Sequence, residues 1–221
     1  KVSYRFSEVY TSEFSHLNVN NFSKTNLPKA TELVSKLSNA TQRNARHTMF
    51  SHYLTTHQDL PLWVLVTKLT FGEITNFYKL ITPNIQERIL KDIHKEYTGE
   101  YKVSITDPTS TLIPVFSEIL DVLVGYRNVC AHGDRLYNHR IIGPKKTIKK
   151  LTYYFVQTPK GSESSVYGVL ISLRLLLPRI SYKCIIDEVI NELILLSESL
   201  PVIQFNQVLA RMELTLQWKQ T

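Results

Sequence analysis

Apolar residues recur at intervals of three and four between Leu112 and Asn128, and this pattern constrains the fold more than any other feature of the chain. Each residue of an α-helix turns about 100°, so this spacing places the apolar side chains on one wide face. Pro114 falls in the first turn, where its missing N–H leaves no helical hydrogen bond unmade. We therefore predict a buried helix whose core face consists of Leu112, Val115, Phe116, Ile119, Leu120, Leu123 and Tyr126.

The same periodicity recurs along most of the 221 residues, so the sequence predicts an all-α helical bundle with a single core. Proline in a first turn marks the start of three further helices, near Pro28, Pro61 and Pro83. Phe71-Gly72 interrupts the helix that starts at Pro61, which indicates either a kink or two helices. Three more helices are predicted at 164–177, 181–200 and 202–216.

Three segments depart from this pattern. Residues 1–27 are polar with scattered aromatic side chains, so we expect an irregular N-terminal segment before one helical domain at 28–221. Tyr97–Thr109 contains Gly99 and Pro108 and is expected to form a loop. Leu151–Gln157 is rich in aromatic and β-branched residues, so we expect a short β-like segment there, with the entry of a helix as the alternative.

The net charge of the chain is +7, and most of it lies in one stretch. Seven basic residues fall between Arg127 and Lys150, where Asp134 is the one acid. Such a concentration of positive charge suits a polyanion, with nucleic acid as the first expectation and an acidic membrane surface as the second. The alternative is a solvated basic loop that binds nothing.

The cysteine content and the apolar stretches indicate in which cellular compartment the protein is expected. Cys130 and Cys184 are too few for the disulfide framework of a small secreted domain, and Cys130 is expected to be buried at a helix contact. Charged residues interrupt the apolar stretches, so we predict no membrane-spanning helix and no membrane partner. The chain begins with Lys and has no signal-peptide pattern, so we expect a trimmed N-terminus and a cytoplasmic location.

The end of the apolar helix contains the main candidates for chemistry, Arg127, Asn128 and His132. Five residues along an α-helix correspond to a rotation of about 140°, so Arg127 and His132 cannot point the same way from one straight helix. Either the helix ends near His132 with Gly133 as its stop, or the pair meets a second copy across a dimer axis. Both arrangements allow a cleft lined by guanidinium and imidazole groups.

Such a cleft is suited to cutting RNA without a metal ion. A neutral imidazole takes the proton from a ribose 2′-hydroxyl, and a protonated one gives a proton to the leaving 5′-oxygen. A guanidinium holds the phosphate through two hydrogen bonds and stabilises the charge of the transition state. Asn128 would orient the imidazole or hydrogen-bond the phosphate. On spacing alone, however, a lone histidine is more often structural than catalytic.

Two stretches of this sequence point to a known family. The string RNVCAHGDRLYN at 127–138 resembles the Arg-x4–6-His signature of the HEPN superfamily, in the form found in Abi-like (abortive infection) proteins. An upstream block, PLWVLV at 61–66 followed by LTFG at 69–72 and FY at 77–78, is similar to the same family. The resemblance covers residues 27–142 and implies an α-helical HEPN fold that dimerises, so that two Arg–His pairs share one cleft.

The resemblance also implies an activity, because family members with an intact motif are typically metal-independent endoribonucleases of phage defence or toxins. It predicts a homodimer that leaves 2′,3′-cyclic phosphate and 5′-hydroxyl ends, needs no cofactor and is restrained by an antitoxin, either protein or RNA. Arg127 and His132 would be the catalytic pair, with Asn128 beside them, while Gly133 stands where many relatives have a second histidine. Further RNA contacts are expected from Arg135, Asn138, Arg140, Lys145, Lys146, Lys149 and Lys150.

Two interpretations of another class stay open. One is a non-catalytic RNA-binding or toxin–antitoxin interaction module on the same scaffold, which binds RNA without cutting it. The other is a purely structural helical dimer in which Arg127 and His132 form a buried polar network.

The remaining candidate residues have simpler interpretations. His47, His52 and His57 recur every five residues, and because each such step turns about 140° on an α-helix, they should splay apart; we predict no metal site. Trp63 and Phe71 are expected to be core aromatics, with stacking against bases as the alternative.

Overall fold

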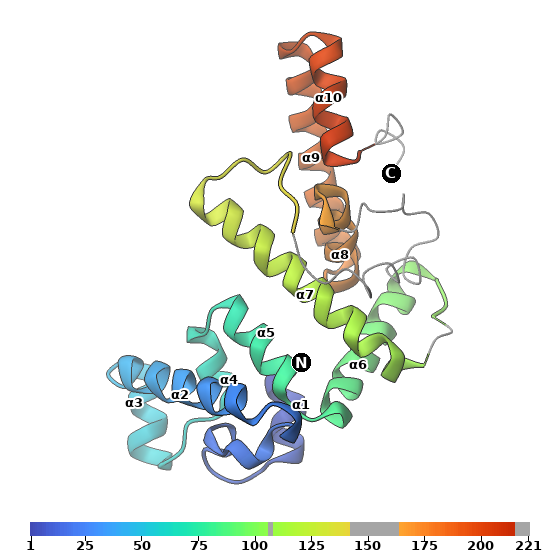
Figure 1. Cartoon of the computed structure of the whole chain (residues 1–221). Helices are drawn as coiled ribbons and strands as arrows, with labels where there is room; N and C mark the ends of the chain where they lie inside the picture. The colour runs from blue at the N-terminus through green and yellow to red at the C-terminus, as the bar shows by residue number, and fades with distance from the viewer. Residues whose placement is uncertain (106–107, 142–163, 215–221) are drawn as a thin grey trace. The chain divides into compact units, whose positions relative to one another are not determined.

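Figure 1 presents the protein as a computed structural model, in which residues 1–105, 108–141 and 164–214 are described. Ten α-helices and no β-strand occur in these residues, and one isolated antiparallel bridge joins Phe22 to Ile81. The all-α prediction is confirmed. The β-like segment expected at Leu151–Gln157 lies outside the described residues.

The chain divides into two compact units, Lys1–Asp92 and Ile93–Thr221, whereas the sequence led us to expect a single core and a boundary near residue 28. The N-terminal residues explain the difference, because two of their aromatic side chains, Phe6 and Phe22, are buried in the interior of the first unit. The ring of Phe6 lies 5.1 Å from that of Phe77, and Phe22 lies 5.3 Å from the same ring.

The first unit is built from short helices. In chain order it contains α1 (Val2–Val9), three single 3-10 turns between Ser15 and Asn26, α2 (Leu27–Asn44), α3 (Thr48–His52), a π-helical turn (Tyr53–His57), α4 (Leu62–Leu65), a 3-10 turn (Val66–Lys68) and α5 (Phe71–Leu80). The helix α6 (Pro83–Tyr101) begins in this unit and continues into the second.

Local sequence rules account for where several of these helices begin. The side chain of Asn26 accepts a hydrogen bond from the Lys29 amide at 3.4 Å and caps α2, as its position before Pro28 suggested. Thr70 and Glu73 form a capping box at the start of α5. This box separates α4 from α5, so of the two alternatives at Phe71-Gly72 the structure has two helices.

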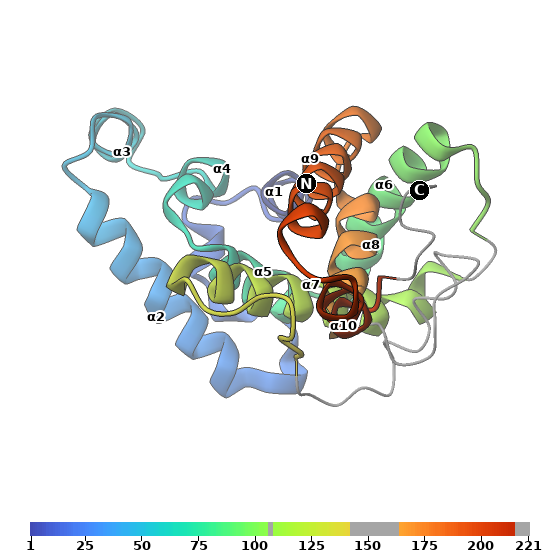
Figure 2. The same cartoon turned by 90° about the horizontal axis from the view of Figure 1, so that it is seen from above.

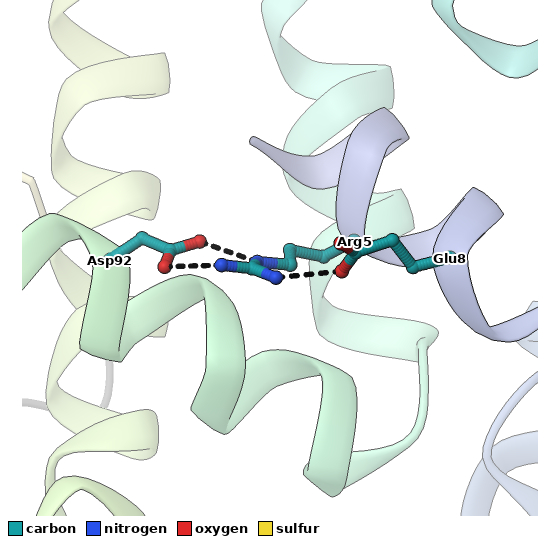
Figure 3. Close-up of polar contacts among 3 residues, drawn as sticks. All are labelled: Arg5, Glu8 and Asp92. Carbon is teal, nitrogen blue, oxygen red and sulfur yellow. Dashed lines mark hydrogen bonds and ion pairs between the residues drawn. The ribbon is translucent and has the colours of Figure 1, made fainter.

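An ion pair joins α1 to α6 (Figure 3). Nε and Nη2 of Arg5 each lie 2.7 Å from a carboxylate oxygen of Asp92, and Nη1 lies 2.7 Å from Glu8 Oε2. The hydrogen bonds from Arg5 hold the pKa of Asp92 below its usual value. Residues 1–27 are therefore not irregular throughout, because α1 is fixed by contacts with residues more than 70 positions away, which local sequence patterns do not reveal.

The second unit contains the C-terminal part of α6, α7 (Thr109–His132), α8 (Val166–Leu176), α9 (Arg179–Ser199) and α10 (Val202–Met212). α7 contacts α8, and α9 and α10 lie side by side (Figure 1) around a buried cluster of Leu193, Phe205, Leu209 and Leu214. The three predicted C-terminal helices are confirmed. The loop expected at Tyr97–Thr109 begins later, because α6 continues through Gly99 to Tyr101, whose ring lies 5.0 Å from that of Tyr97.

α7 is the one helix among the described residues with the length and hydropathy to cross a membrane. The mean hydropathy of its most apolar window is 1.2, and 44% of that window is buried within the structure. Core helices of water-soluble domains have the same properties, and all seven residues predicted for the core face of α7 are buried.

Candidate active site

The end of α7 places the predicted catalytic residues on the surface. Tyr126 and Val129 continue the buried face of the helix, whereas Arg127, Asn128 and His132 are all exposed. This separation follows from the helical period, because Tyr126 and Val129 are three residues apart and share one face. The two buried side chains anchor the last turns of the helix and leave the polar ones free to meet a ligand.

Gly133 ends α7 directly after His132, which is the first of the two arrangements that the sequence left open. Its backbone adopts the left-handed conformation, with φ of 69°, which costs glycine little and other residues more. The amide of Gly133 donates to the carbonyl of Cys130 at 3.3 Å, and the amide of Asp134 donates to that of Val129 at 3.1 Å. These two bonds form a Schellman motif, which satisfies carbonyls at the helix end and fixes His132 as its last residue.

Arg127 and His132 leave α7 in different directions. Because the helix stays regular through His132, the two residues differ by about 140° in rotation and about 7.5 Å along the axis. Nη1 of Arg127 donates instead to the side-chain oxygen of its neighbour Asn128, at 3.2 Å. In one chain, Asn128 thus orients the guanidinium.

Tyr126 ties the chain that follows the motif back onto α7. Its hydroxyl lies 2.6 Å from the carbonyl oxygen of His139 and 2.9 Å from that of Ser164, and burial raises its pKa to about 12. The amide of Ile141 also donates to the Ser164 carbonyl, at 3.3 Å. Gly125 leaves room for Cδ1 of Ile141, the atom that a Cβ at this position would displace.

The residues predicted to contact RNA differ in their surroundings. Arg135 and Asn138 are exposed, in accord with that prediction. Arg140 instead forms an ion pair with Glu213, at 2.5 Å, and donates to the carbonyl of Arg211 at 3.5 Å, so a phosphate would compete with these partners. The remaining four, Lys145, Lys146, Lys149 and Lys150, lie outside the described residues.

Cys130 was expected to be buried, and this is wrong because the residue is exposed. It lies about 60° around the helix from Arg127, on the solvent side, whereas the core face ends at Tyr126 and Val129. The exposed surface at the end of α7 therefore includes Cys130 as well as the three predicted polar residues.

Two histidines of the first unit, His52 and His57, also lie differently from prediction. Within the described part of the chain, no three metal-ligating side chains gather in one place. The rings of His52 and His57 nevertheless do not splay, because the π-helical turn at Tyr53–His57 replaces the assumed α-helix and brings them to 5.3 Å. Trp63 was expected in the core but is 50% exposed.

The fold and this site define an all-helical protein whose longest described helix ends in an exposed Arg-Asn and His motif with a glycine cap. The sequence model of the Abi-like protein family matches residues 1–138, a stretch that contains the whole first unit and the motif. The chain belongs to the Abi-like protein family. No curated protein and no solved structure matches it.

Proposed function

We propose that this protein is a metal-independent endoribonuclease with a HEPN-type Arg–His site, acting in abortive infection as a phage-defence toxin. The observation that supports it is the joint exposure of Arg127, Asn128 and His132 at the capped end of α7. Membership of the Abi-like family suggests the role in abortive infection. The net positive charge between Arg127 and Lys150 supports RNA as the substrate.

The chemistry assigns one task to each side chain. His132 removes the proton of a ribose 2′-hydroxyl, whose oxygen attacks the adjacent phosphorus. The bond from phosphorus to the 5′-oxygen breaks, and that oxygen takes up a proton, which leaves a 2′,3′-cyclic phosphate and a 5′-hydroxyl. Arg127, oriented by Asn128 at 3.2 Å, stabilises the charge that develops on the phosphate oxygens.

The divergence of Arg127 and His132 favours a site built from two copies. A rotation of about 140° within one regular helix prevents both side chains from facing the same small ligand. Two α7 ends placed side by side would supply the arginine from one copy and the histidine from the other. We therefore propose a homodimer as the active form, with a two-fold axis beside the end of α7.

One observation favours the non-catalytic alternative, an RNA-binding or toxin–antitoxin interaction module. The imidazole of His132 is exposed and makes no side-chain hydrogen bond to another described residue. An imidazole without a partner has no fixed tautomer or orientation, which a general base needs. In this alternative the same surface binds RNA or an antitoxin, and no strand is broken.

The test uses end-labelled RNA, excess EDTA and identification of the product termini. Wild type should cut to cyclic-phosphate ends, and His132→Ala should slow cutting by about 100- to 10,000-fold while the Kd for RNA changes little. Cys130→Ala, a change on the same exposed surface, is the matched control and should cut like wild type. Loss of cutting in EDTA, or equal cutting by His132→Ala, would contradict the proposal, and RNA binding without products would favour the module.

Mixing two inactive variants tests the shared site. If arginine and histidine come from different copies, a mixture of Arg127→Ala and His132→Ala regains about a quarter of wild-type activity through mixed dimers. If both residues act within one copy, the mixture stays inactive.

A further inference from the structure

Four aromatic and imidazole rings form a connected cluster in the first unit, away from the Arg–His motif in sequence. The rings of His52 and His57 are 5.3 Å apart, those of Tyr53 and His57 also 5.3 Å, and those of Tyr53 and Trp63 5.6 Å. His52 is the last residue of α3, Tyr53 and His57 bound the π-helical turn, and Trp63 belongs to α4.

The π-helical turn is what brings these rings together. A π-helix pairs residues five apart, so His52 and His57 come to neighbouring positions that an α-helix would separate. Gln58 ends the turn in the left-handed conformation, with φ of 52°, an unfavourable backbone for a residue other than glycine. The chain thus adopts two uncommon conformations within six residues, and such features gather at functional sites.

The cluster is open to solvent. His52 and His57 are exposed, Tyr53 is half-buried, and Trp63 is 50% exposed, unlike the fully buried Tyr78 and Phe77 of the same unit. Indole and phenol faces left in water are the groups on which nucleic-acid bases stack. Figure 2 shows α3 at the end of α2, where the chain leads into this cluster.

The surrounding sequence is positively charged. Between residues 38 and 72 the charged residues are Arg43, Arg46, Lys68 and a single acid, Asp59. The three cations are exposed, whereas Oδ1 of Asp59 already accepts a hydrogen bond from the Phe14 amide at 2.7 Å. Exposed rings in a stretch of sequence with three exposed cations and one acid suit a stacked base with its phosphate, and this favours nucleic acid over a protein partner.

We propose that Tyr53, His57 and Trp63 form a stacking site for a base of single-stranded RNA, with Arg43 and Arg46 contacting its backbone. The proposal rests on the proposed function for its ligand, RNA, but uses residues of the first unit that take no part in the chemistry. Its role is to hold the substrate strand in a sequence-tolerant way, because every base has a stacking face.

Fluorescence of Trp63 gives a direct test. The chain has two tryptophans, Trp63 and Trp218, so Trp218→Phe leaves Trp63 as the only indole. This change is combined with His132→Ala to prevent cutting, and the protein is titrated with a 12-nucleotide adenosine RNA. Stacking predicts saturable quenching of the Trp63 emission with the same Kd as the anisotropy of a labelled RNA, and less quenching by an abasic oligomer.

Substitution separates stacking from charge. Tyr53→Ala should raise the Kd for the RNA about 5- to 150-fold, the effect of losing one stacked base, and Tyr53→Phe should restore it. Tyr4, exposed by 64% on α1, offers the matched control, and Tyr4→Ala should leave the Kd within about twofold. Circular dichroism establishes that each variant is folded before its Kd is compared.

The outcomes separate this inference from the proposed function. If the protein that retains His132 binds and cuts RNA while the Trp63 emission stays unchanged, the stacking site is wrong. The proposed nuclease activity would still hold. Quenching with no cutting would support the stacking site and contradict the nuclease. If Trp63→Ala changes the mass of the oligomer and not the Kd for RNA, the surface is a protein contact and the inference is wrong.

Discussion

Replacing Tyr126 with Phe removes one oxygen atom from a buried position and should destabilise the second unit. Tyr126 is 3% exposed, and its hydroxyl lies 2.6 and 2.9 Å from two carbonyl oxygens. A hydroxyl carries one proton, so the two carbonyls share a single donor. Without it, both carbonyls lose that partner, and among the described residues the Ser164 carbonyl keeps the amide of Ile141 at 3.3 Å.

The expected cost is about 1–3 kcal/mol in the free energy of unfolding, the range for leaving a buried polar group unpaired. Urea unfolding followed by circular dichroism measures it. Hydrogen exchange localises the effect, because the amide of Ile141 should lose protection while the amides of α2 do not.

Tyr137 provides the control. It is half-buried, lies in the segment just after α7, and has no hydrogen bond through its hydroxyl within the described residues. Tyr137→Phe should change the free energy of unfolding by less than about 0.5 kcal/mol. The reasoning fails if Tyr126→Phe is as stable as wild type, or if both variants lose the same amount.

Two further predictions concern packing and protonation. Gly125→Ala gains up to about 1 kcal/mol of helix propensity, but its Cβ atom displaces Cδ1, the flexible end of Ile141. Its effect on the free energy of unfolding should therefore be more favourable in an Ile141→Val background, which lacks Cδ1, than in the wild-type chain, and equal effects in the two backgrounds would contradict this contact. Burial lowers the pKa of His16 to about 4, so the folded chain takes up this proton at lower pH than the unfolded chain does. The free energy of unfolding should therefore fall as the pH drops from about 6.5 towards 4, and His16→Leu should flatten that fall; an unchanged pH dependence would contradict the assignment.

Local sequence rules predicted the parts of the fold that depend on neighbours in the chain. Asn26 before Pro28 indicated the start of α2, and Gly133 after His132 indicated the end of α7; both are found. The apolar face of α7 was also predictable, because the 3.6-residue period alone decides which side chains share a face. The helix end at the candidate catalytic residues followed from the same two rules, whereas their exposure did not, because the sequence left open a buried polar network of Arg127 and His132.

Features that depend on distant or unusual contacts were not predictable. The ion pair of Arg140 with Glu213 joins residues 73 positions apart, and no pattern in the basic segment predicts it. The convergence of His52 and His57 requires a π-helical turn, whereas the sequence argument assumed the commoner α-helix. Periodicity placed Trp63 on an apolar helix but could not show that its ring faces solvent, because exposure depends on which neighbours cover it.

The bonds between Ile141, Ser164 and Tyr126 have a consequence for how the second unit is held together. They join Ile141, three residues beyond the end of the family match at residue 138, directly to Ser164. The contact between the end of α7 and the residues that lead into α8 is therefore made on either side of positions 142–163, by residues 126, 141 and 164 themselves.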